Sequence, residues 1–164
     1  MVEIFNNRIE ITNPGTPLIP INRFIDGYVS RNELLAGIMR RMGICEEKGS
    51  GFDKIITYNE LYQLPPINIE IDNNKTKVTI YSYKELNQLE KTEKIMACYQ
   101  HACLKYASRE KMTNLSFRKR FNIEDKNSAI ASRIIQDTLS AGLIKLANED
   151  KNSRKFASYL PVFD

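Results

Sequence analysis

The pattern that most constrains the fold is a series of three helical stretches in the second half of the chain. In residues 92–106, apolar side chains recur at the 3.6-residue helical period over four turns. A short second stretch, 113–121, begins at Thr113, a residue type suited to cap a helix. The third stretch, 127–141, ends at Gly142, which suits a left-handed C-terminal cap. This order predicts three helices in close succession, with a turn at 123–126 between the second and the third.

The residues after the third stretch predict a β-hairpin. Apolar residues mark 143–146 and 154–162, and a polar turn separates them at 148–153. Three helices followed by such a hairpin indicate a winged helix-turn-helix, with the hairpin as the wing. In that architecture the third helix enters the major groove of DNA, and the wing lies over a phosphate backbone or the minor groove.

Polar and basic side chains gather on the predicted third helix and wing. Asn and Arg read base edges by paired hydrogen bonds, whereas other Lys and Arg side chains hold phosphates. Glu124 and Asp125 act against DNA binding, because acids near the reading helix repel phosphate unless they only cap its N-terminus. The residues expected to face DNA are Lys126, Asn127, Ser128, Ser132 and Arg133, and those expected to hold phosphates are Arg118, Lys119, Lys151, Arg154 and Lys155.

The charge is unevenly divided between the two halves. Residues 1–90 carry 10 Lys+Arg and 12 Asp+Glu, a net charge of −2, whereas residues 91–164 carry 14 and 8, a net charge of +6. A local surplus of positive charge attracts phosphate backbones, although an ordinary soluble surface can carry as much. A winged helix that binds a protein partner is therefore an open alternative to one that binds DNA.

The first half predicts a smaller α+β unit. Residues 2–11 alternate apolar and polar side chains around Asn6-Asn7, which indicates a hairpin with Ile9 and Ile11 facing one core. A second hairpin is expected over 67–81, with its turn at 72–74.

Two helices are expected between these hairpins. The first begins with capping-box spacing at Ser30 to Glu33 and ends at Gly43. The second follows the loop Gly49-Ser50-Gly51 and stops before Pro65-Pro66. Its residues Phe52, Ile55, Ile56 and Asn59 are expected to lie on one face of the helix. The predicted division is an α+β domain over 1–83, a linker over 84–90 and the winged helix over 91–164.

Three spaced motifs carry a resemblance to a known family. They are VEIFNNRIEITNPG at 2–15, SRNELLA at 30–36 and MGICEEKGSGF at 42–52. Together they resemble the C-terminal region of RecG-related ATP-dependent helicases, proteins commonly labelled transcriptional regulators, over about residues 2–81. In that family a Schlafen/AlbA-type domain precedes this region and a winged helix follows it. The resemblance implies that the chain is a C-terminal piece of a longer protein.

The same region is similar in part to the ATP-binding fold of histidine kinases. In that fold an Asn-bearing helix, an acidic-Gly loop and a Gly-rich lid hold nucleotide and magnesium. The resemblance implies nucleotide contacts at Asn13, Gly15, Gly49, Ser50 and Gly51. The Asn-bearing helix would lie before Met1, and Asn13 replaces the expected acid, so ATP and Mg²⁺ are expected only in the full-length parent and no cofactor is expected here.

Other chemistry is weakly indicated. Cys98 and Cys103 are expected to be core thiols and His101 a surface residue, because the three do not share one helix face, and no metal site is expected. A single histidine without an orienting partner argues against an enzyme. No stretch approaches the roughly 20 apolar residues of a membrane span, and no signal peptide is evident, so a cytoplasmic protein without a membrane partner is expected.

The predicted function is thus a DNA-binding regulatory fragment of α+β class, in which a partly histidine-kinase-ATPase-like domain precedes a winged helix. Its expected partner is duplex DNA, and it is expected to act as a homodimer, because one winged helix reads only a short half-site. Two alternatives stay open. One is the C-terminal piece of a helicase-like protein whose missing N-terminal part carries the nucleotide chemistry, and the other is a protein-interaction or dimerisation winged helix.

Overall fold

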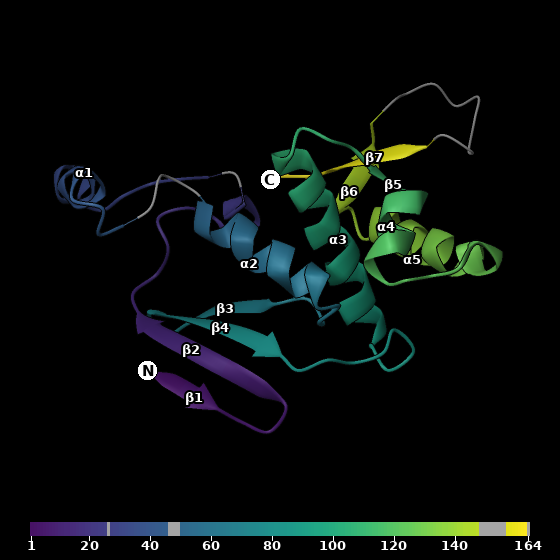
Figure 1. Ribbon diagram of the computed structural model, residues 1–164, viewed down its shortest axis with the longest axis horizontal. Helices are drawn as coiled ribbons and strands as arrows, with labels where there is room; N and C mark the ends of the chain where they lie inside the picture. The colour runs from purple at the N-terminus through teal and green to yellow at the C-terminus, as the bar shows by residue number, and fades with distance from the viewer. Residues whose placement is uncertain (26, 46–49, 148–156, 164) are drawn as a thin grey trace.

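A computed structural model describes residues 1–25, 27–45, 50–147 and 157–163 of the chain (Figure 1). These residues form two antiparallel sheets and five α-helices, which confirms the expected mixture of helix and strand. The first sheet has the order β1-β2-β4-β3, and the second has the order β5-β7-β6. The strands are β1 Val2–Ile4, β2 Arg8–Pro14, β3 Asn68–Asp72, β4 Lys75–Tyr81, β5 Met112–Thr113, β6 Ile144–Leu146 and β7 Ser158–Pro161. The helices are α1 Glu33–Arg41, α2 Ser50–Leu61, α3 Lys91–Ala107, α4 Asn114–Arg120 and α5 Ser128–Ser140, with 3₁₀ turns at Ile21–Arg23 and Asp125–Asn127.

The first sheet confirms both predicted hairpins. Asn73 and Asn74 have φ angles of 46° and 57°, the left-handed pair that joins β3 to β4 in a two-residue turn. Ile9 pairs with Ile80 and Ile11 pairs with Val78, so these side chains lie on one face of the sheet. The expected burial of Ile9 is wrong, because its side chain is 38% exposed. The core beneath this sheet forms mainly at β3 and β4.

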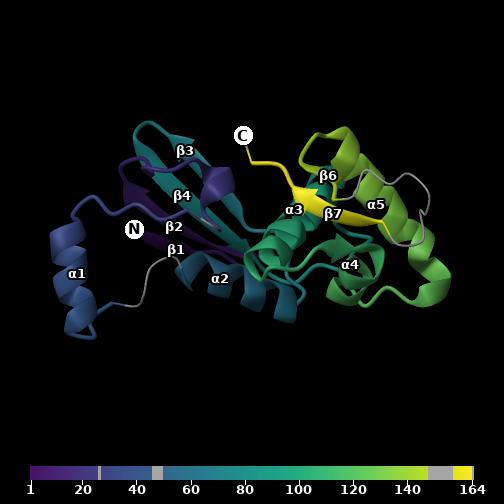
Figure 2. The same cartoon turned by 90° about the horizontal axis from the view of Figure 1, so that it is seen from above.

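Helix α1 forms as expected but its cap lies elsewhere. The side chain of Asn32, rather than that of Ser30, accepts a hydrogen bond of 2.9 Å from the Leu35 amide. The apolar side of α1, which includes Leu34 and Ile38, is exposed. In both views α1 stands apart from the other helices (Figures 1 and 2).

Helix α2 packs against α3 and lies along one face of the first sheet (Figures 1 and 2). Ile56 is 1% exposed and joins Ile67 in the core. One expectation for this segment is wrong: Ser50 and Gly51 lie inside the first turn of the helix rather than in a loop before it. Of the residues expected to share one face, Ile56 and Asn59 are buried, whereas Ile55 is 40% exposed. A glycine needs no special backbone conformation at a helix N-terminus, so its presence did not mark a loop.

The second half follows the predicted order of helices and strands. Helix α3 buries Cys98 and Ala102, and α5 buries Ala131 and Ile134 against it. The turn between α4 and α5 includes Asn122, whose φ of 50° is left-handed. The strand β5, which lies between α3 and α4 and pairs with β7, was not expected, because two residues show no alternation.

One hydrophobic core runs through both halves of the chain. The cluster that holds Ile56 and Ile67 continues into Tyr99, Phe117 and Ile135. The Gln100 side chain on α3 also donates a 2.8 Å hydrogen bond to the carbonyl oxygen of Ile67. The predicted linker over 84–90 therefore lies beside an uninterrupted set of core contacts, and the domain boundary there stays a prediction.

A buried polar cluster joins α2 to α3 and α4. His101 Nδ1 lies 2.9 Å from Glu60 Oε2, and His101 Nε2 lies 3.1 Å from Ser116 Oγ. Arg120 Nε lies 3.5 Å from Glu60 Oε1, and the Arg120 guanidinium donates a 2.9 Å hydrogen bond to the Leu64 carbonyl. Burial lowers the pKa of Arg120, and the nearby Glu60 charge opposes that shift.

The expectation that His101 is a surface residue is wrong, since it is 3% exposed. The signal was in the spacing: His101 follows Cys98 by three residues and precedes Ala102 by one, so it lies on the core face of α3. Its orienting partner, Glu60, is 41 residues away in sequence and could not be paired with it from spacing alone.

The three cysteines are expected to differ sharply in reactivity. Cys98 and Cys103 are buried core thiols, as expected, whereas Cys45 is exposed. Burial raises the pKa of Cys98 to about 12, so its thiolate is scarce at neutral pH. Under native conditions at pH 8, Ellman's reagent should therefore modify Cys45 rapidly and the other two only on unfolding, which mass spectrometry of the adducts can check. Rapid labelling of Cys98 in the folded chain would contradict the packing described for α3.

Candidate nucleic-acid interface

Helix α5 presents one face to solvent and the opposite face to the core. Ala131, Ile134, Ile135 and Thr138 are buried. The exposed positions are Ala129, Ile130, Ser132, Arg133, Gln136 and Ser140. Apart from Ile130, these positions carry small or uncharged polar side chains and one cation, a composition that can approach the edges of bases.

Gln136 was missed by the sequence analysis, although its spacing pointed to this face. It lies three residues after Arg133 and four after Ser132, so the three share one side of the helix. A Gln side chain can hydrogen-bond an adenine edge through two atoms. The exposed face therefore offers two long side chains, Arg133 and Gln136, of types that can hydrogen-bond base edges.

The position of α5 is set by contacts with α4. Thr113 caps α4 as expected, accepting a 3.1 Å hydrogen bond from the Ser116 amide. Asn114 then donates from Nδ2 to Ser132 Oγ at 3.0 Å and to the Ser128 carbonyl at 3.5 Å. Ser128 and Ser132, both expected at the interface, therefore also help to hold α5 against α4.

The acids before α5 are paired with cations. Arg118 forms an ion pair with Asp125, and its Nε donates a 3.0 Å hydrogen bond to Asn114 Oδ1. Lys126 Nζ lies 2.6 Å from Glu124 Oε2. These pairs reduce the repulsion that the two acids would exert on phosphate, but they also engage Arg118 and Lys126.

The other residues expected to contact DNA are either exposed or outside the described part of the chain. Lys119 on α4 and Asn127 before α5 are exposed. Lys151, Arg154 and Lys155 lie outside the described residues, as does Gly49 of the predicted nucleotide site.

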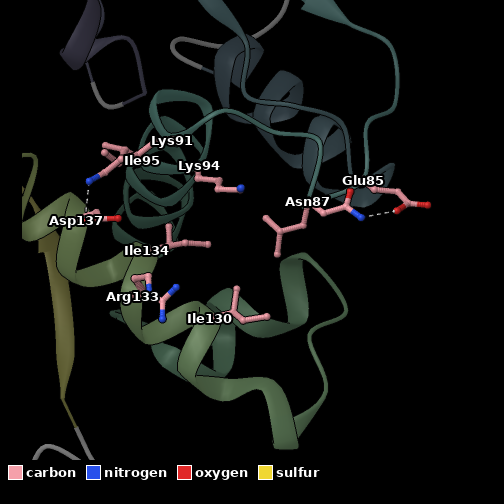
Figure 3. A pocket seen from close by; sticks show the side chains of 10 residues that line it. Glu85, Asn87, Lys91, Lys94, Ile95, Ile130, Arg133, Ile134 and Asp137 are labelled. Atoms are coloured by element: carbon pink, nitrogen blue, oxygen red, sulfur yellow. Dashed lines mark hydrogen bonds and ion pairs between the residues drawn. The ribbon is translucent and has the colours of Figure 1, made fainter.

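A cavity of about 670 Å³ adjoins the exposed face of α5 (Figure 3). It lies between α3, α5 and residues 85–87. Three cations line it, Lys91 and Lys94 from α3 and Arg133 from α5. Lys91 Nζ lies 3.1 Å from Asp137 Oδ1, whereas the side chains of Lys94 and Arg133 make no hydrogen bond or ion pair with any residue that the structure describes. The sequence carries no local sign of this cavity, because its walls come from three separate segments.

A second cavity, of about 450 Å³, lies at the end of β2. Asn13 and Gly15, two of the residues expected to contact nucleotide, line it together with Arg31 and Phe52. Gly15 has a φ of 96°, which favours glycine, and its carbonyl accepts a 2.8 Å hydrogen bond from Thr76. Of the other expected residues, Gly51 lies in the first turn of α2.

The strands and helices around this second cavity lie in a region whose sequence matches a known protein family. Residues 1–80 match the family model described as "Putative ATP-dependent DNA helicase recG C-terminal". This confirms the expected resemblance for the RecG-like region, the name used below for residues 1–80. Comparison with curated proteins and with solved structures found no match.

The RecG-like region contains α1, α2 and most of the first sheet. It ends one residue before the end of β4, so α3, α4, α5 and the second sheet lie beyond the match. No group of His, Cys, Asp or Glu among the described residues is placed to hold a metal ion. Within the same residues, no helix is long and apolar enough to cross a membrane.

Proposed function

We propose that α3, α4, α5 and the second sheet form a winged helix-turn-helix that binds duplex DNA, and that the chain is part of a transcriptional regulator. The observation that carries this proposal is the solvent face of α5, where Ser132, Arg133 and Gln136 stand together and the adjacent acid, Asp137, is paired with Lys91. The strand order β5-β7-β6 supports it, because the strand between the first two helices then pairs with the outer strand of the wing.

Affinity in this proposal comes mainly from phosphate contacts. Residues 91–164 carry a net charge of +6, and Lys119 is exposed on α4 beside the interface. Specificity comes from Arg133 and Gln136 in the major groove. The protein binds as a homodimer, because two copies of α5 are needed to read a two-part operator.

The test is binding of a labelled random-sequence duplex and of a selected high-affinity duplex, measured by fluorescence anisotropy over a series of salt concentrations. Log affinity should fall linearly with log salt, with two chains bound per selected duplex. Arg133→Ala should lose about 1–3 kcal/mol of discrimination between the two duplexes. Lys75→Ala, a matched loss of one exposed cation on β4, should change neither quantity.

Absence of salt-dependent duplex binding would overturn the proposal. If the chain instead captured a protein through α5, and Arg133→Ala weakened that capture, the protein-interaction alternative would replace it.

The ion pair between Arg118 and Asp125 yields a second measurable effect. Asp125→Asn removes an acid beside the N-terminus of α5 and releases the Arg118 guanidinium to bind a phosphate. We expect tighter duplex binding, with the magnitude of the salt slope increased by about 0.9 for the added phosphate contact. Asp72→Asn, which removes an exposed carboxylate at the end of β3 in the first sheet, is the control. An unchanged or weaker slope in Asp125→Asn would show that Arg118 serves only to hold the turn.

A second candidate function is nucleotide binding as part of a longer helicase-like protein. It is favoured by the family match of residues 1–80 and by the cavity that Asn13 and Gly15 line. Arg31 lines the same cavity and can neutralise a phosphate. Fluorescent trinitrophenyl-ATP with Mg²⁺ tests this function. Binding should weaken in Arg31→Ala and persist in Arg133→Ala, and a chain that binds no nucleotide excludes the function for these residues.

A further inference from the structure

The cavity between α3 and α5 has an apolar wall. Leu86, Ile95, Ile130 and Ile134 line it. Figure 3 shows Ile130 and Ile134 of α5 pointing into the same hollow as Lys94 of α3. The volume of about 670 Å³ lies within the range of small-molecule sites, which are apolar with a few polar groups that set orientation.

The charged groups of this cavity leave two cations available. Of the two acids, Asp137 pairs with Lys91 at 3.1 Å, whereas Glu85 accepts a 3.1 Å hydrogen bond from Asn87, which orients its carboxylate and leaves its charge in place. The side chains of Lys94 and Arg133, by contrast, have neither a hydrogen bond nor an ion pair within the described part of the chain. Two available cations beside a hydrocarbon wall favour a ligand that is both anionic and apolar.

From this arrangement we infer that the cavity binds a small carboxylate with an apolar body. The carboxylate lies between Lys94 and Arg133, and the hydrocarbon part packs against Ile95, Ile130 and Ile134. A neutral or cationic ligand of the same shape lacks the attraction of the two cations, and a small anion without a hydrocarbon part leaves the apolar wall in contact with water.

This site also supplies a regulatory consequence, which rests on the proposed function. Arg133 belongs both to the cavity and to the face of α5 proposed to read DNA. A bound carboxylate draws the guanidinium toward the cavity, so the ligand and the duplex compete for one side chain. By linkage, duplex and ligand then weaken each other's binding by the same factor.

The experiment uses three probes with the full chain: octanoate, octylamine with the same tail and opposite charge, and acetate with the same head group and no tail. Isothermal titration calorimetry gives affinities, and spectra of ¹³C-labelled isoleucine methyl groups locate the binding. Octanoate should bind about tenfold or more tightly than either other probe. The largest methyl shifts should fall on Ile95, Ile130 and Ile134.

Single substitutions separate charge from shape. Lys94→Gln and Arg133→Gln should each weaken octanoate binding about tenfold, because each removes one charge-assisted hydrogen bond. Ile130→Asp should abolish binding without disturbing the fold, because Ile130 is 46% exposed. Lys145→Gln, an exposed lysine on β6 outside the cavity, should bind octanoate as the natural chain does.

Equal binding of octanoate and octylamine, or methyl shifts confined to other isoleucines such as Ile38 of α1, would overturn the inference. The two proposals fail separately. If duplex binds and octanoate does not, the cavity proposal is wrong and the interface stands. If octanoate shifts Ile130 and no duplex binds, the cavity stands and the proposed function is wrong.

Discussion

Replacing Glu60 by Gln is expected to lower the free energy of unfolding by about 3–5 kcal/mol, because the change leaves a buried guanidinium without its counter-charge. The Glu60 side chain is 14% exposed and the Arg120 side chain only 2%. Glu60 also contacts His101 Nδ1 with both carboxylate oxygens, at 3.0 and 2.9 Å. Domains of this size have only about 5–15 kcal/mol of stability, so the loss should be plain in a urea titration followed by circular dichroism.

Two further variants decide whether the effect comes from the buried charge. Glu60→Gln combined with Arg120→Met removes both charges and should recover part of the lost stability. Glu85→Gln removes an exposed carboxylate and should leave the urea midpoint nearly unchanged. If Glu60→Gln unfolds at the same urea concentration as the natural chain, the cluster does not stabilise the junction of α2 with α3 and α4.

Local sequence rules predicted most helices and hairpins because their signals are periodic or conformational. The turn at Asn73 and Asn74 and the C-terminal cap at Gly142 need positive φ, which few residue types adopt. The cap of α1 was placed wrongly, since Ser30 and Asn32 both have side chains that can cap a helix.

Partners distant in sequence could not be assigned from spacing. His101 and Arg120 are of residue types that are usually exposed. Their burial depends on Glu60, which α2 places in contact with both side chains. The prediction of the interface was incomplete for the same reason. Arg133 and Ser132 could be predicted from the helical pattern, but the pairing of Arg118 with Asp125 depends on the turn between α4 and α5. The cavity beside Arg133 depends on three segments meeting and had no local signal.

The second large effect concerns the core that links the two halves. Phe117→Ala should lower the free energy of unfolding by about 3–5 kcal/mol, because the Phe117 side chain is fully buried and its removal leaves a cavity. The ring packs edge-on against Phe121 at a centroid distance of 5.4 Å and lies 6.1 Å from the His101 ring. Phe117→Leu keeps part of the volume and should cost less, and Tyr62→Ala, which removes a 65% exposed ring, should cost little.

Hydrogen exchange measured on Phe117→Ala also tests how far this core acts as one unit. Because the core cluster runs from Ile67 through Tyr99 to Ile135, we expect amides of β4 and of α5 to lose protection by the same free energy. A loss confined to α4 and α5, with β4 still protected as in the natural chain, would show two cooperative units that meet at the predicted boundary over 84–90. In that case the RecG-like region would keep its fold while the proposed DNA-binding unit opened. A uniform loss would instead mean that any ligand of the first half also stabilises α5, since both halves would then share one folding equilibrium.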